Sequence, residues 1–174
     1  YTSEGKSRYA SHQYTDQQLQ DLVVINAIAL LLGDYSVHGN NLLITGDRLV
    51  KIDWDAALRN VLDERNNTDI DNPVEYQQKS WKRTTKNYHR NYERMTRCDF
   101  RALVQACAQT LLSRMQTNKI SMETLVSEAF EELLEEFQEH LNSRTNDRDA
   151  KAAYATALEN RLNALTRRAG GTQS

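Results

Sequence analysis

The sequence predicts a mainly α-helical fold with one β-hairpin, and three observations support this. The 174 residues include one proline and six glycines, which favours long helices over tight loops. Apolar residues recur at helical spacing in several segments. Two short apolar, β-branched runs flank Gly46-Asp47, which predicts strand, tight turn and strand. The length suffices for one domain with a substantial core.

Residues 1–14 are polar and are expected to form a flexible leader. Residues 15–65 are expected to hold a buried helix and the hairpin. Thr15 is typical of an N-cap, and the helix that it opens runs from Asp16 to about Leu32, with apolar residues almost all round. The predicted elements that follow are strands Asn41–Thr45 and Arg48–Asp53, a short helix from Trp54 to about Glu64, and a loop from Asn66 to Pro73.

Residues 74–168 are expected to be helical, and residues 169–174 to form a flexible tail. Their apolar stripes predict three helices beyond a basic stretch. The first follows an Asp99 N-cap and covers Phe100 to Met115, the second runs from the Ser121 cap to about Leu141, and the third opens at a capping box of Asn146 and Asp149 and ends near Arg168.

The segment between the first helix and the end of the hairpin carries the most informative polar residues. A hairpin returns Asp53 close to Asn40, while Asp34 lies at the mouth of the same turn and His38 lies in the loop between them. Carboxylate and amide oxygens in such a set suit magnesium that carries the phosphates of a nucleotide. Taken singly, each residue is also typical of an ordinary turn or helix cap.

The order of these residues resembles the catalytic core of kinase-fold phosphotransferases. Gly33-Asp34, His38-Gly39-Asn40 and Lys51-Ile52-Asp53-Trp54-Asp55 are similar to the motifs of the aminoglycoside-phosphotransferase and phosphoinositide-kinase branches. The resemblance implies that Asp34, with His38 in its loop, is catalytic and orients an acceptor hydroxyl. It implies that Asn40 and Asp53 hold Mg²⁺ on ATP. Asp34 and Asn40 are one residue further apart than is usual, so Asn41 is an alternative ligand.

The same resemblance implies a C-terminal lobe with a helical extension, acting on a lipid headgroup, a small molecule or a protein. No glycine-rich loop with a phosphate-binding lysine precedes Asp34. We therefore expect that the chain is a fragment, and that it has little phosphotransfer activity without an N-terminal lobe. The expected location is cytoplasmic, and a secreted bacterial effector acting in a host cytoplasm would fit.

A basic stretch supplies a second hypothesis of a different class. Residues 79–97 interleave aromatic residues with cations, and the candidate anion-binding residues are Lys79, Lys82, Arg83, Lys86 and Arg90. In this interpretation the chain is a non-catalytic helical interaction module, or a pseudokinase, that binds an anionic lipid or protein. A solvated helix face paired with acids elsewhere explains the stretch equally well.

The composition excludes some classes of partner and site. The net charge is −2, which argues against a general attraction to nucleic acid. No apolar run reaches the length of a transmembrane segment. Cys98 and Cys107 form no disulfide framework, suit a reducing compartment and are predicted to be buried thiols. The glutamates of residues 121–141 lack the histidine spacing of a di-iron site, and His140 is expected to be exposed.

Overall fold

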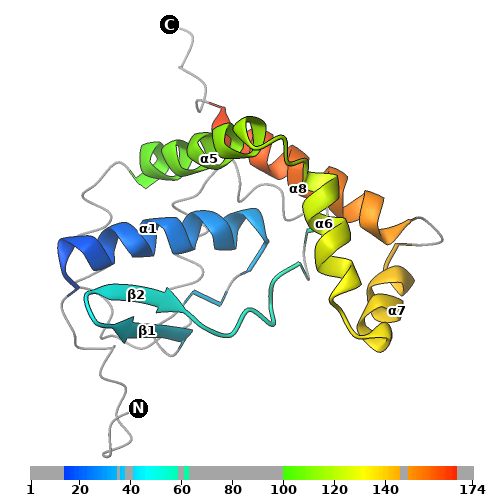
Figure 1. Ribbon diagram of the computed structural model, residues 1–174. Coiled ribbons are helices and arrows are strands. Elements are labelled where there is room, and N and C mark those ends of the chain that lie inside the picture. The colour runs from blue at the N-terminus through cyan, green and yellow to red at the C-terminus, as the bar shows by residue number, and fades with distance from the viewer. Residues whose placement is uncertain are drawn as a thin grey trace, which may run out of the picture.

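Helix α1 (Asp16–Leu31) is the element around which the described structure is built. The computed structural model describes residues 14–34, 36–37, 41–58, 61–62, 100–145 and 149–167. The hairpin packs on one side of α1, and helices α5 and α8 pack on the other (Figure 1). The prediction of a mainly helical fold with one hairpin is confirmed for these residues, whereas the arrangement of a kinase C-terminal lobe is not shown.

Both ends of α1 are capped by its own sequence. Thr15 is the predicted N-cap, and with Gln18 it forms a capping box, in which each side chain accepts a hydrogen bond from the other's backbone N–H. Gly33 follows the helix with φ of 63°, a left-handed conformation that glycine adopts at low cost. The N–H groups of Gly33 and Asp34 then donate to the carbonyls of Leu30 and Ala29. This Schellman motif directs the chain out of α1 toward the hairpin.

The hairpin joins β1 (Leu42–Thr45) and β2 (Arg48–Lys51), which pair antiparallel. Thr45 pairs with Arg48, so the turn is the predicted Gly46-Asp47, and Gly46 has a φ of 63°. The predicted helix from Trp54 to about Glu64 is not found in its described residues. They form turns, and Leu58 has a φ of 66°, a conformation that interrupts an α-helix.

Residues 100–145 and 149–167 form four helices: α5 (Phe100–Thr117), α6 (Met122–Glu131), α7 (Glu135–Ser143) and α8 (Ala150–Thr166). Helices α5 and α6 both pack on α8. The predicted cap Ser121 accepts a backbone hydrogen bond from the helix that it opens. The last helix begins later than predicted: Asp149, expected inside a helix opened by Asn146, is itself the N-cap and accepts from the backbone N–H of Lys151, while Asn146 lies outside the described residues.

The prediction of a single helix from Ser121 to about Leu141 is wrong. The first helix ends at Glu131, and a second helix begins at Glu135. Glutamates four residues apart repel one another on a helix surface. Glu128 and Glu132, Glu131 and Glu135, and Glu132 and Glu136 all have this spacing. The run of like charges therefore weakens a continuous helix where the break occurs.

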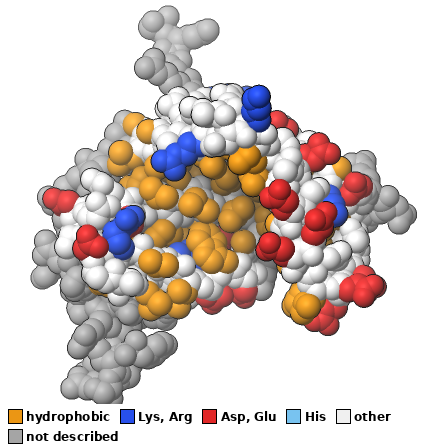
Figure 2. All heavy atoms as spheres, in the orientation of Figure 1, with side chains coloured by type: hydrophobic (Ala, Val, Ile, Leu, Met, Phe, Trp, Pro, Cys, Tyr) orange, Lys and Arg blue, Asp and Glu red, His pale blue; other side chains and the backbone are white. Residues whose placement is uncertain are grey.

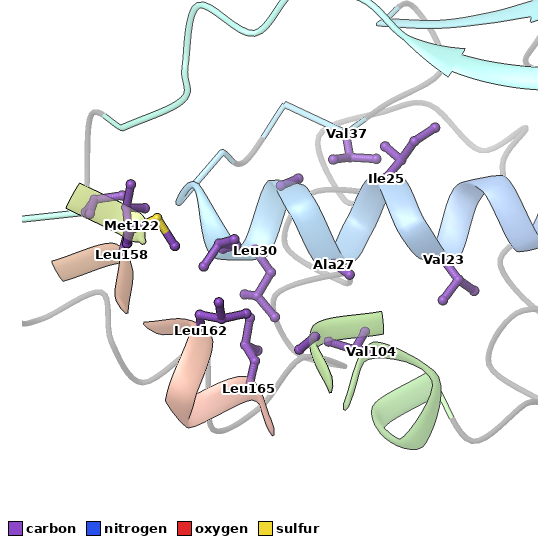
Figure 3. Close-up of a cluster of buried hydrophobic side chains, with 14 of the residues drawn as sticks. Val23, Ile25, Ala27, Leu30, Val37, Val104, Met122, Leu158, Leu162 and Leu165 are labelled. Carbon is purple, nitrogen blue, oxygen red and sulfur yellow. The ribbon is translucent and has the colours of Figure 1, made fainter. Parts of the chain in front are cut away.

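The core lies on the faces of α1 that meet its neighbours. Figure 3 shows Leu30 of α1 on the side of Leu162 and Leu165 of α8, while Ile25 and Val37 lie together on the opposite side. A second contact joins α6 to α8, where the rings of Phe130 and Tyr154 have centroids 6.1 Å apart. Within the described ranges, no helix is long and apolar enough to cross a lipid bilayer.

Candidate functional site

Asp34, the predicted catalytic acid, is fully buried beside a lysine. Its Oδ2 lies 2.9 Å from Nζ of Lys51, and both side chains have an exposed fraction of zero. Its Oδ1 accepts hydrogen bonds from the backbone N–H of Ser36, at 2.7 Å, and from the Ser36 hydroxyl. The Lys51 ammonium also donates to the backbone carbonyls of Ile52 and Asp53, at 3.3 and 2.6 Å. The ion pair thus fastens the chain leaving α1 to the end of β2.

The other predicted site residues lie at different depths. The hairpin does return Asp53 toward Asp34, because Lys51 contacts the carboxylate of one and the backbone carbonyl of the other. The Asp53 side chain is exposed, however. His38 and Asn40 lie outside the described residues. Asn41, the alternative ligand, is buried and donates from its amide to the Ser36 carbonyl, so it holds the loop.

Lys51 is the residue that the sequence analysis missed. Residues alternate between the faces of a strand, and in β2 Leu49 and Lys51 point inward while Arg48 and Val50 point outward. Its ammonium lies 4.1 Å from the centroid of the Trp54 ring, which adds a cation–π contact. The Lys51 ammonium therefore neutralises Asp34, which the resemblance implied to be a catalytic acid. Two features of the sequence could have predicted this pair: the alternation of inward and outward residues along β2, which turns Lys51 inward, and the acid Asp34 at the mouth of the hairpin.

A second carboxylate, Asp21 of α1, holds the other end of the hairpin. It accepts hydrogen bonds from the Arg48 guanidinium, the shortest at 2.7 Å, and from the backbone N–H of Leu49 at 2.8 Å. The Arg48 side chain is largely exposed, whereas Asp21 is buried. Hydrogen bonding from Arg48 lowers the pKa of the Asp21 carboxyl more than burial raises it. Asp21 therefore stays ionised and fixes β2 against α1.

We expect Asp21 to make stability depend on pH. Because its pKa is lowered in the folded chain, its contribution is complete above the ordinary aspartate pKa and is lost as pH falls through the folded value. Between about pH 5 and pH 3, the free energy of unfolding of the Asp21→Asn variant should fall less than that of the unmodified chain. Urea unfolding at several pH values measures this. Asp47→Asn, in the turn of the same hairpin, is the control. An equal pH dependence in Asp21→Asn and the unmodified chain would show that Asp21 does not make stability depend on pH.

Arg161 of α8 anchors the C-terminal end of α1. The side chain is buried, and it donates from Nε to the Leu31 carbonyl at 2.9 Å and from a terminal nitrogen to the Leu30 carbonyl at 2.6 Å. The last carbonyls of a helix have no partner within it and carry partial negative charge. The buried Arg161 guanidinium donates hydrogen bonds to these carbonyls and places a positive charge beside their partial negative charge. It thereby holds α8 against α1.

An apolar groove runs between α1 and α5 on the opposite side of α1 from β2. Two adjoining hollows of about 340 and 480 Å³ share Val24, Cys107 and Thr110 and so form one continuous surface. We call this surface the α1–α5 groove. Figure 2 shows the hydrophobic side chains gathered in the centre of this face of the molecule. Three residues that line the groove remain more than a third exposed: Val24, Ile28 and Leu103.

Charged side chains lie only at the ends of this groove. Among its lining residues, Asp16 is at one end and Arg114 at the other. Cys107, predicted to be a buried thiol, is half-buried in the wall, and burial raises the pKa of its thiol. The groove is thus a dry, weakly charged surface that suits apolar ligands better than ions.

Several predictions fall outside the described residues or have no test in them. The described residues do not include the predicted thiol Cys98 or the basic stretch with Lys79, Lys82, Arg83, Lys86 and Arg90. No cluster of three or more His, Cys, Asp or Glu side chains suited to a metal ion occurs among the residues that the structure describes. Binding of magnesium and ATP stays a prediction, since His38 and Asn40 belong to the set on which it depends. His140 is exposed, as expected.

Comparison with known proteins identifies a family. A family model described as the LepB N-terminal domain matches residues 2–168. No curated protein matches the chain, and neither does any solved structure.

This match corrects the assignment to a kinase-fold family. The matched family is not one of the aminoglycoside-phosphotransferase or phosphoinositide-kinase families, and no similar structure supports a kinase fold. The prediction of a kinase-like phosphotransferase acting on phosphoinositide is therefore wrong, and the family match gives no evidence for ATP binding. Short motifs are open to this error, because turn and cap residues produce the same order of acids and amides. In the structure Asp34 is paired with Lys51 and Asn41 holds a loop.

Proposed function

The chain belongs to the LepB N-terminal domain family, and we propose that it is a non-catalytic helical interaction module. In this proposal the α1–α5 groove binds one helix of a partner protein by its apolar face. The observation that carries the proposal is a central helix that is apolar all round but is left uncovered along one side.

A helix that is apolar on every side is normally covered on every side. In α1, ten of sixteen residues are buried, against β2, α5 and α8. Val24 and Ile28 are one turn apart, and they keep exposed fractions of 45 and 39 %. Covering two such side chains contributes about 1 kcal/mol each or more. A ligand that fills the groove completes the burial of α1.

The dimensions of the groove favour a helix as the occupant. At 1.5 Å per residue, the part of α5 from Leu103 to Arg114 spans roughly 17 Å. This length matches about three turns of a partner helix, whose apolar residues would recur at every third or fourth position. Since charges lie only near the ends, at Asp16 and Arg114, recognition depends on apolar burial rather than on ion pairs.

The test uses a synthetic peptide of about 12 residues, with leucine along one helix face and glutamine and alanine elsewhere. Isothermal titration calorimetry should show binding with a negative heat-capacity change and little dependence on salt. A peptide of the same composition in scrambled order should not bind. Binding by the scrambled peptide, or the absence of binding by the amphipathic one, would contradict the proposal.

Two matched variants locate the binding site. Ile28 in the groove and Ile120 outside it have the same exposed fraction, 39 %. Ile28→Gln should weaken binding at least about fivefold, because it places a polar group at the centre of an apolar contact. Ile120→Gln should leave the affinity unchanged. If the chain itself covers the groove in solution, the peptide does not bind and Ile28→Gln instead lowers the stability of the chain, which would overturn the proposal.

A further inference from the structure

Helix α7 presents an apolar face that no described element covers. None of its residues is buried, and it makes no extensive contact with another described helix or strand. Leu134, at its N-cap, and Phe137, in its first turn, have exposed fractions of 65 and 52 %, the largest among the exposed large hydrophobic residues. Both belong to the apolar stripe of residues 121–141, of which Val126 and Phe130 are buried.

The exposed residues form one continuous face. Leu134, Phe137 and Leu141 are spaced by three and then four positions, which places them on one side of a helix. Leu141 is partly buried against the core, so the face is anchored at its C-terminal end and open at its N-terminal end. A helix of nine residues is marginal in water without tertiary packing. The α7 face, meaning these three residues, therefore has the properties of a binding surface.

The charge around the α7 face selects the occupant. Residues 122–141 contain seven glutamates and no lysine or arginine, whereas the whole chain has a net charge of only −2. Figure 2 shows acidic side chains concentrated around this part of the molecule. On a helical projection Gln138 and His140 flank the face, and Glu136 lies next to His140. Glu131 ends α6 and Glu132 is its C-cap, just before Leu134 in the chain. Such a surface repels anionic lipid and nucleic acid, and attracts cationic protein segments.

We propose that the α7 face binds a basic amphipathic helix of another protein. Apolar residues of that helix cover Leu134 and Phe137, and its lysine or arginine residues face Glu131, Glu132 and Glu136. This surface is separate from the α1–α5 groove, and the proposal does not depend on the groove being occupied. It predicts binding that weakens with salt, whereas binding in the groove does not.

The test uses a fluorescently labelled amphipathic helical peptide of leucine and lysine, and the same peptide with glutamate in place of lysine. Fluorescence anisotropy should detect binding of the lysine peptide alone, with an affinity that falls about tenfold or more as salt rises from low to high concentration. Equal binding of the glutamate peptide would overturn the proposal, as would a salt-independent affinity.

Variants then locate the site. Phe137→Gln should weaken binding of the lysine peptide at least about fivefold, and Leu125→Gln, at an exposed leucine of α6, should not. Glu136→Gln should weaken binding less and reduce its salt dependence, while Glu159→Gln on α8 should do neither. Circular dichroism verifies that each variant keeps its helices, and Glu136→Gln gives an independent test if Phe137→Gln unfolds α7.

Loss of binding in Ile28→Gln but not in Phe137→Gln would overturn the proposal and place the peptide in the groove. Self-association of the unmodified chain that Phe137→Gln abolishes would also overturn it, because a second copy would then cover the α7 face.

Discussion

Replacing Lys51 by methionine is expected to lower the free energy of unfolding by about 3–5 kcal/mol. The substitution leaves the Asp34 carboxylate buried without its cation, and an unpaired buried charge is far more costly than the net worth of the pair. The Lys51 and Asp34 side chains are both fully buried, so water cannot replace the ammonium without opening the hairpin. Urea unfolding followed by circular dichroism measures the loss, and Lys151→Met on α8 is the control.

A double-mutant cycle separates the ion pair from the general loss of a lysine. Asp34→Asn combined with Lys51→Met removes both charges, so the double variant should be more stable than Lys51→Met alone. If Lys51→Met costs less than about 1 kcal/mol, or if the two substitutions add without coupling, Asp34 and Lys51 do not form the pair seen here.

Replacing Arg161 by leucine is expected to cost about 2–4 kcal/mol. The guanidinium donates to the carbonyls of Leu30 and Leu31 at the buried end of α1, and backbone acceptors cannot be removed together with their donor. Hydrogen bonds to a charged group contribute about 1.5–3 kcal/mol, and the buried Leu31 carbonyl loses this donor at a further penalty. The Leu30 carbonyl still accepts from the Gly33 N–H. The midpoint of urea unfolding should fall without a change in its slope.

Two further variants test the role of Arg161. Arg161→Lys keeps the charge but lacks the planar fork that reaches two carbonyls, so it should recover only part of the lost stability. Arg167→Leu, at the exposed end of the same helix, should change stability by less than about 0.5 kcal/mol. Equal effects of Arg161→Leu and Arg167→Leu would show that the buried contact does not hold α8 to α1.

The local elements of this fold could be predicted from the sequence where periodicity and caps agree. Thr15 and Ser121 open the helices that they were expected to open, and Gly46-Asp47 forms the turn of the hairpin. The failures occur where the apolar pattern continues but another effect dominates. Repulsion between neighbouring glutamates accompanies the break between α6 and α7. The left-handed backbone at Leu58 interrupts the helix expected after the hairpin.

The candidate site was predictable in its proximity but not in its chemistry. A hairpin necessarily returns the chain, and the Asp53 backbone carbonyl does approach Asp34 through Lys51, but the Asp53 side chain is exposed. The cation between them was not foreseen, because Lys51 entered the sequence comparison only as part of the Lys51-Ile52-Asp53 motif and no role was predicted for it. The buried pair was therefore interpreted as catalytic, and the family match replaces that assignment.

The exposed apolar faces could not be predicted because exposure is a tertiary property. Periodicity identifies the apolar side of a helix but not whether a neighbour covers it. Val24 and Ile28 on α1 are open, whereas Leu22 and Leu30 on the same helix are fully buried. Leu134 and Phe137 continue the stripe of Val126 and Phe130, yet the latter two pack in the core and the former two do not.

Photo-crosslinking tests most directly whether the α1–α5 groove binds a partner helix. The neutral amphipathic peptide would carry one photoreactive leucine on its apolar face, and mass spectrometry would locate the labelled residues. Binding in the groove should place labels on α1 around Val24 and Ile28 and on α5 around Leu103 and Cys107, and these labels should be lost in Ile28→Gln. Labels that fall on the hairpin or on α7, or that spread evenly over the chain, would contradict it.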